Sequence, residues 1–129
     1  MSLARNLYRQ TAKQAPTNVQ DPHEIVTLTL KELVKALSVL SLAQEQGRSY
    51  PAQPLNRALT AIYVLQSSLD FEAGGAIAQD LFQIYEFARH HALKAWRGEP
   101  EARLREAEAV MGDILEAWEA IGPQVRMSA

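Results

Sequence analysis

The chain has 129 residues, a formal net charge of -2 and no cysteine. This length suits one domain with a single core. A composition of 47% apolar and 22% charged residues excludes an intrinsically disordered chain. Without cysteine the protein forms no disulfide and no thiolate metal site. Charges of both signs are interspersed without a long basic run, so the sequence gives no reason to expect a nucleic-acid partner.

The amino-terminal segment differs in pattern from the rest of the chain. Residues 1–20 contain a short apolar cluster of Leu3, Leu7 and Tyr8 and then a turn-forming stretch, Ala15-Pro16-Thr17-Asn18. We therefore expect an arm. Neither a signal-peptide core nor a run of eighteen apolar residues occurs, which predicts a cytoplasmic protein without membrane insertion.

The first long helix is predicted to begin at Asp21. The Asp21 carboxylate suits the N-cap position, Pro22 suits the first helical position, and Glu24 completes a capping-box-like pattern. Apolar residues then recur at alternating spacings of four and three, as on one face of a helix. They are Val26, Leu30, Leu33, Leu37 and Leu40. Gly47 is expected to end this helix.

Two further helices are predicted between the next chain breakers. The second begins near Pro51 and Pro54 and ends at a break at Gly74-Gly75. Its apolar seam is formed by Leu55, Ala58, Ile62, Leu65 and Leu69. The third helix continues to Gly98 and Pro100. Its seam is formed by Ile77, Leu81, Ile84, Ala88, His91 and Ala95.

The fourth helix follows Pro100 and is stopped by Gly122-Pro123. The same spacing returns in Leu104, Ala107, Met111, Ile114, Trp118 and Ile121. Four such helices with short connections predict an all-α fold, an up-and-down antiparallel four-helix bundle over residues 21–122 with a carboxy-terminal tail at 123–129. A more irregular orthogonal helical bundle is the alternative.

The first and third helices carry more apolar residues than one seam needs. The first adds Ile25, Leu28, Val39 and Leu42. The third adds Phe82, Tyr85, Phe87, Ala92, Leu93 and Trp96. Such residues either complete the core or lie under the arm, or they form an exposed patch of the kind that binds a partner. Any single one of them is more often a core residue, but their number favours a groove.

The histidines and carboxylates that could form a metal or catalytic site do not have the spacing that such a site requires. Glu86 and His90 share a helical face, but a di-iron carboxylate bundle needs Glu-x-x-His pairs from two helices, and His23 lies at a predicted helix start. His90 and His91 instead suit interactions with helix-terminal carbonyls. Gly74-Gly75 before a helix is a weak anion-binding signal, and no nucleotide-binding or nucleophile-elbow motif occurs. We expect no catalytic residue, no metal site and no cofactor.

One longer sequence stretch, at the end of the second helix and along the third, is more specific than these short motifs. The stretch from Leu65 to Phe87 includes Leu69-Asp70-Phe71-Glu72-Ala73-Gly74-Gly75-Ala76-Ile77-Ala78, followed by Asp80-Leu81 and Tyr85-Glu86-Phe87. This stretch resembles the signature of the FliS flagellar export chaperones, which typically reads Leu-Asp-x-Glu-x-Gly-Gly-x-Ile-Ala-x-Asn-Leu-x-x-Leu-Tyr-x-Tyr. The resemblance extends over nearly the whole chain through Leu7-Tyr8, Asp21-Pro22-His23-Glu24 and Trp118. The chain departs from the family pattern at Thr27, Thr29, Lys31-Glu32 and Asp80.

The resemblance implies a cytosolic chaperone rather than an enzyme. Such a protein would bind the disordered carboxy-terminal segment of flagellin, prevent premature polymerisation and deliver the subunit to the flagellar type III export apparatus, with the export gate as a further partner. We expect the binding surface on the second and third helices and on the arm. It comprises Leu7, Tyr8, Ile62, Leu65, Leu69, Phe71, Ile77, Leu81 and Tyr85. Of these, Ile62, Leu65, Ile77 and Leu81 are the most core-like, and Leu7 and Tyr8 are candidates to cover the groove in place of the client.

The alternative function belongs to another class. The apolar stripes could form a permanent dimer interface in a self-associating helical bundle that acts as a regulatory or structural adaptor. For the chaperone we expect a monomer or a weak homodimer. The oligomeric state measured with and without a client peptide therefore separates the two functions.

Overall fold

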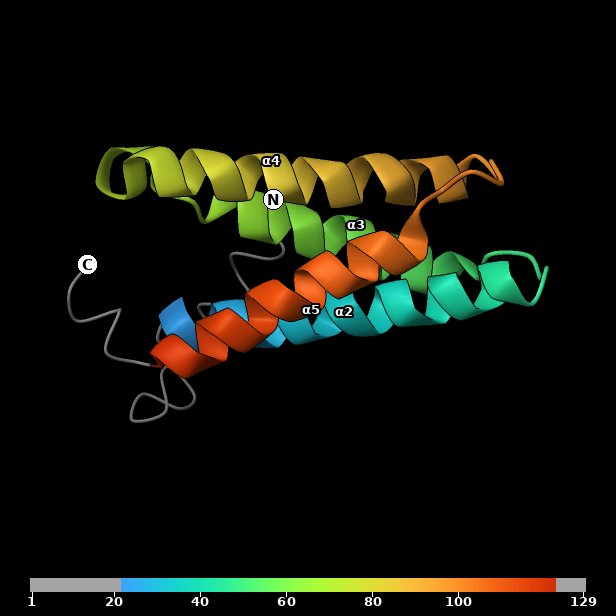
Figure 1. Ribbon diagram of the computed structural model, residues 1–129, viewed down its shortest axis with the longest axis horizontal. Helices are drawn as coiled ribbons and strands as arrows, with labels where there is room; N and C mark the ends of the chain where they lie inside the picture. The colour runs from blue at the N-terminus through green and yellow to red at the C-terminus, as the bar shows by residue number, and fades with distance from the viewer. Residues whose placement is uncertain (1–21, 123–129) are drawn as a thin grey trace, which may run out of the picture.

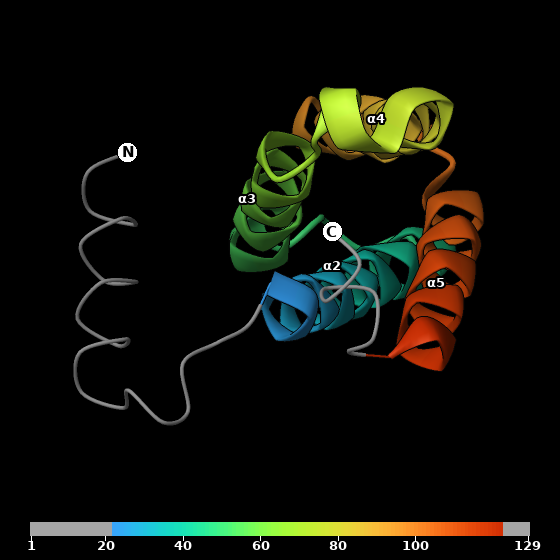
Figure 2. The ribbon, with the colours of Figure 1, turned by 90° about the vertical axis from the view of Figure 1, so that its left-hand side faces the viewer.

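The computed structural model describes residues 22–122, and every regular element among them is an α-helix. The four helices are α2 (Pro22–Glu45), α3 (Ala52–Ser67), α4 (Phe71–Trp96) and α5 (Leu104–Ile121). Consecutive helices run in opposite directions (Figure 1). Seen end-on they form the four sides of a bundle, with α2 packed against both α3 and α5 and α4 closing it (Figure 2). The predicted antiparallel four-helix bundle is confirmed, whereas the arm, the Asp21 cap and the tail lie outside the described residues.

The leucines of α2 form the largest part of the core. Leu30, Leu33, Leu37 and Leu40 are completely buried, as their spacing along one helical face predicts. The neighbouring helices fill the same core with residues of their own predicted seams. These are Leu55, Ala58, Ile62 and Leu65 on α3 and Leu104, Ala107 and Met111 on α5. At the end of α5 the predicted seam fails, because Ile121 is exposed.

The core-facing side of α4 differs from the predicted seam. Its buried residues are Ala78, Tyr85, Ala88, His91, Ala92 and Ala95. Ile77, which was expected to be structural, is 71% exposed, and Leu81 is only partly buried against the core. The prediction is wrong at Ile77 because an alternating four-and-three spacing also fits a register that begins at Ala78.

The break between α3 and α4 lies earlier in the chain than predicted. The Asp70 carboxylate caps α4 by accepting hydrogen bonds from the backbone N–H groups of Glu72 and Ala73, both at 3.0 Å. The predicted break at Gly74-Gly75 is confirmed as a kink, because Gly75 has the non-helical angles φ of 52° and ψ of -127° and separates the turn that begins at Phe71 from the rest of α4. Glycine adopts these angles readily and L residues do not.

Two reciprocal hydrogen bonds join the first turn of α2 to the last turn of α5. His23 Nε2 donates to the carbonyl oxygen of Trp118 at 3.0 Å, and Trp118 Nε1 donates to the carbonyl oxygen of His23 at 3.1 Å. The two rings stack with their centroids 4.6 Å apart. The carbonyl oxygen of Trp118 also accepts from the backbone N–H of Gly122 at 3.3 Å, so His23 adds a second donor there and has a structural role.

The opposite end of the bundle is tied by Gln44 of α2. Its side-chain amide donates to the carbonyl oxygens of Pro100 at 3.2 Å and Ala102 at 2.6 Å, in the connection between α4 and α5. An ion pair between Glu45 and Arg105 joins the same helices beside it. Both ends of the α2–α5 pair are therefore fixed by side-chain bonds as well as by packing.

Replacing Gly75 by alanine is expected to lower the free energy of unfolding by about 1–3 kcal/mol, because an L side chain is strained at these backbone angles. Urea unfolding followed by circular dichroism measures the change. Gly112 of α5 is the matched control, since a Cβ added there meets no atom within 4 Å. Gly112→Ala should raise the free energy of unfolding by about 0.5–1 kcal/mol. Equal effects of the two substitutions would contradict the role of the kink.

Candidate functional site

The residues predicted to bind a partner do not form one surface. Three of them belong to the core, with 3% exposure or less: Ile62, Leu65 and Tyr85. Leu69 and Leu81 are partly buried against that core, and only Phe71 and Ile77 are exposed. Outside the described residues lie Leu7 and Tyr8. The buried members are inaccessible because one helical face of α3 and α4 supplies the core, so a partner meets only the outer residues.

The exposed pair lies at the kinked start of α4. The side chain of Phe71 is 46% exposed, and its ring tilts against that of Phe82 with 6.0 Å between the centroids. The turn that carries Phe71 is held between the Asp70 cap and the Gly75 kink. The glycine-containing stretch noticed in the sequence therefore lies among exposed apolar side chains. We refer to Phe71, Ile77 and Phe82, in the amino-terminal half of α4, as the α4 patch.

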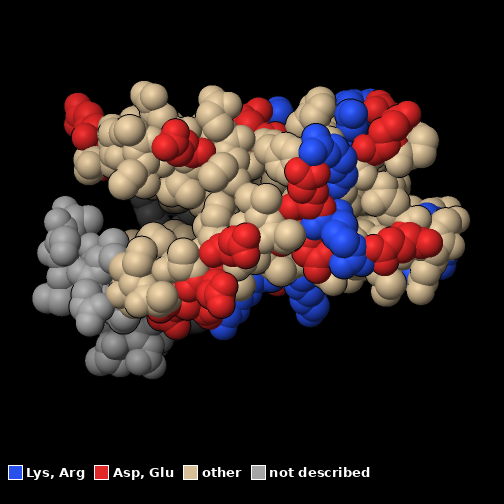
Figure 3. Space-filling model, in the orientation of Figure 1, with Lys and Arg blue, Asp and Glu red and all other residues tan. Residues whose placement is uncertain are grey.

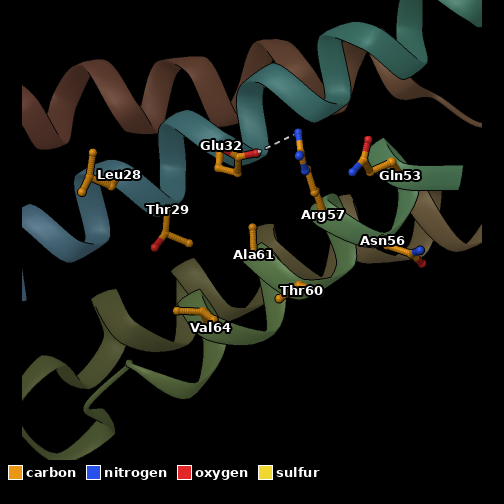
Figure 4. Close-up of a pocket in the computed structure, with 9 residues that line it drawn as sticks. All are labelled: Leu28, Thr29, Glu32, Gln53, Asn56, Arg57, Thr60, Ala61 and Val64. Atoms are coloured by element: carbon orange, nitrogen blue, oxygen red, sulfur yellow. Dashed lines mark ion pairs between the residues drawn. The ribbon is translucent and has the colours of Figure 1, made fainter. Parts of the chain in front are cut away.

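A groove of about 520 Å³ lies between α2 and α3 (Figure 4). One end has apolar walls formed by Leu28, Ala61 and Val64. An ion pair crosses the middle, where Glu32 Oε2 lies 3.7 Å from Arg57 Nη1. The remaining lining is polar and uncharged: Thr29, Gln53, Asn56 and Thr60.

Sequence reasoning identified Leu28 as surplus apolar surface but missed the α3 wall of this α2–α3 groove. The available signal was the spacing of Asn56, Thr60 and Val64, which marks a second face of α3 outside its seam. That face is mixed in polarity and resembles an ordinary solvated surface. Only the packing of α3 beside α2 turns it into the wall of a groove.

A second, smaller groove of about 290 Å³ lies between α4 and α5. Its lining comprises Gln83, Ile84, Phe87, Glu106 and Val110. At its rim the Arg103 guanidinium lies 5.6 Å from the centre of the Phe87 ring and pairs with Glu106 at 2.7 Å. Charged side chains of both signs form a band across α4 and α5 on this face (Figure 3). This α4–α5 groove is therefore apolar inside and charged at its edge.

His91 connects α4 to the start of α5. Its ring is buried, packs against Phe87 with 4.7 Å between the ring centres, and accepts a hydrogen bond at Nδ1 from the backbone N–H of Arg103 at 3.0 Å. Burial lowers the pKa of His91, and the positive charges of His90, Lys94 and Arg103 lower that pKa further. A neutral His91 is what the bond to Arg103 requires.

The prediction of a helix-terminal carbonyl contact is wrong for His91, whose Nδ1 accepts from the backbone N–H of Arg103, whereas His23 makes such a contact. Among residues 22–122, no group of three or more His, Asp or Glu side chains is placed to hold a metal ion. In that same part of the chain, no helix is long and apolar enough to cross a membrane. The two grooves and the α4 patch are the accessible features considered for partner binding.

Comparisons with known proteins lead to one family. Residues 4–125 match the family described as "Flagellar protein FliS". The chain is 27% identical over 118 residues to the flagellar secretion chaperone FliS of Vibrio cholerae, covering 91% of this chain and 87% of that protein. It is 28% identical over 119 residues to FliS of Salmonella typhimurium, covering 91% and 88%. It is 24% identical over 120 residues to the flagellar secretion chaperone FliSB of Pseudomonas aeruginosa, covering 92% of this chain and 94% of that protein.

The bond to His91 is expected to make stability depend on pH. The pKa of His91 in the folded protein lies below the ordinary value of about 6.5, so the unfolded chain binds more protons between these two values. The stability contributed by His91 is therefore complete above about pH 6.5 and is lost as the pH falls towards the folded-state pKa. Urea unfolding between pH 8 and pH 5 should show a smaller acid loss for His91→Gln than for His90→Gln. An NMR titration that places the His91 pKa above 6.5 would contradict the argument.

Proposed function

This chain belongs to the FliS family of flagellar proteins, and we propose that it acts as a cytoplasmic secretion chaperone that binds the disordered carboxy-terminal segment of flagellin. The observation that carries the proposal is that a member of this family presents open, apolar-walled grooves beside a complete core. The relatives named as flagellar secretion chaperones match it over most of their length. Binding the segment would keep flagellin from polymerising before export.

The physical basis is helix recognition in a groove. A disordered segment that becomes an amphipathic helix buries its apolar face between two helices of the chaperone. It loses conformational entropy as it orders, which limits the affinity. A limited affinity suits a client that must be released to the type III export apparatus, for which the export gate is the further partner that we propose. This function needs binding energy and no catalytic group.

The α4 patch extends the available surface beyond the grooves. Phe71 and Ile77 are the accessible members of the surface predicted from the sequence. Leu28 and Val64 add apolar surface in the α2–α3 groove, and both are more than one-third exposed. Exposed apolar side chains of this size are candidates for contact with a partner. We propose that the client segment covers these residues while the buried members of the predicted set support them from below.

Calorimetry with the carboxy-terminal segment of flagellin tests this function. We expect a one-to-one complex with a negative heat-capacity change, because apolar surface is buried on binding. Light scattering should show the same stoichiometry. Ile77→Asp should weaken binding by about tenfold, since a carboxylate would have to be desolvated under the client. Ile121→Asp, which also changes an exposed isoleucine, is the control. Stable dimers that do not bind the flagellin segment would support the self-associating adaptor instead.

We also propose that Leu7 and Tyr8 of the arm cover part of the client surface in the free protein. Deleting residues 1–15 should leave the bundle folded and increase the binding of an apolar dye. Simple competition between arm and client predicts tighter binding of the flagellin segment by the shortened protein, because the client no longer displaces the arm. An arm that clamps the bound segment predicts weaker binding. Identical affinity and identical dye binding would show that the arm does not dock there.

A further inference from the structure

We propose that the α2–α3 groove takes one amphipathic helix of about three turns, and that a carboxylate on this helix sets its position by binding Arg57. The inference rests on the proposed function, since the occupant is a helix formed by the carboxy-terminal segment of flagellin. It adds the length, the polarity and one charge of that helix. It also assigns opposite roles to the two members of the ion pair that crosses the groove.

The length follows from the wall on α3. Lining residues extend from Gln53 to Val64, which at about 1.5 Å per residue spans roughly 16 Å of helix axis. A helix lying along this wall therefore makes contact over about three turns. Its apolar residues belong at the end where Leu28 and Val64 are exposed. Its polar residues belong at the other end, beside Gln53 and Asn56 (Figure 4).

The charge follows from the residues near the middle of the groove. Arg57 is the only charged residue of α3, which contains no Asp or Glu. On α2, Lys35 follows Glu32 by three residues and Leu28 by seven, so it lies on the same helical face. The groove lining itself carries one cation, Arg57, and one anion, Glu32, and Lys35 adds a positive charge on the same face of α2. A carboxylate on the client is favoured there over an ammonium group.

The existing ion pair is suited to being exchanged. Arg57 and Glu32 are 3.7 Å apart with side chains 50% and 46% exposed, a geometry that contributes little to stability. A carboxylate that binds the guanidinium through two parallel hydrogen bonds forms a stronger contact. Glu32 is then a competitor for Arg57. It disfavours segments that bring a charge without also burying apolar residues against Leu28 and Val64.

Two neutralising substitutions test this assignment because they should act in opposite directions. Calorimetry with the flagellin segment should show about tenfold weaker binding by Arg57→Gln, which loses a charge-assisted contact. Glu32→Gln should bind about two- to threefold more tightly, because the competitor is gone. The dependence of affinity on salt should be smaller for Arg57→Gln than for the unmodified protein. Urea unfolding of both variants shows that the bundle is intact.

Arg89→Gln is the matched control. Arg89 lies on α4, 3.7 Å from Glu86 and 48% exposed, and its substitution should change the affinity by less than twofold. A merely structural ion pair would make Arg57→Gln and Glu32→Gln shift the affinity in the same direction, and that result would overturn the inference while leaving the proposed function intact. An affinity that Arg57→Gln leaves unchanged would also overturn the inference and leave the proposed function intact. No binding of the segment by the unmodified protein would overturn the proposed function and this inference together.

Discussion

The burial of one leucine stripe on α2 is the interaction on which the rest of the bundle depends. Leu30, Leu33, Leu37 and Leu40 are fully buried, and each contributes about 1.5–3 kcal/mol relative to an exposed side chain. Because α2 packs against α3 and α5 at once, this stripe positions the two helices that carry most of the remaining core. The side-chain bonds of His23 with Trp118 and of Gln44 with the α4–α5 connection then fix the two ends of the α2–α5 pair.

The way in which α4 joins this core explains the accessible surface of the protein. α4 contributes mainly alanines and Tyr85 to the interior, so its larger residues Phe71 and Ile77 remain outside. The groove between α4 and α5 is lined by Ile84, Phe87 and Val110, which are only partly buried against the core. A chaperone needs both a stable core and uncovered apolar surface, and this division of residues provides the two together.

The polar residues of the bundle serve its architecture. His91 accepts from the Arg103 backbone at the start of α5, and His23 donates to a carbonyl at its end. Both histidines therefore bind backbone groups at the two ends of α5. The ion pair between Glu32 and Arg57 is different, because it is half-exposed and crosses a groove. Like the Arg103–Glu106 pair at the rim of the α4–α5 groove, it is an accessible charged contact.

The sequence by itself determined the four helices, their order and their approximate limits, because apolar spacing, proline and glycine act locally. It also identified the family, through the stretch around Gly74-Gly75. It did not determine which side of α4 faces the core, because registers beginning at Ile77 and at Ala78 share Leu81, Ala88 and Ala95. That choice was decided by tertiary packing, which buried Ala78 and exposed Ile77. Tertiary structure also decided that Leu28, Glu32, Arg57 and Val64 form a groove, since residues on two helices become neighbours only when those helices pack side by side.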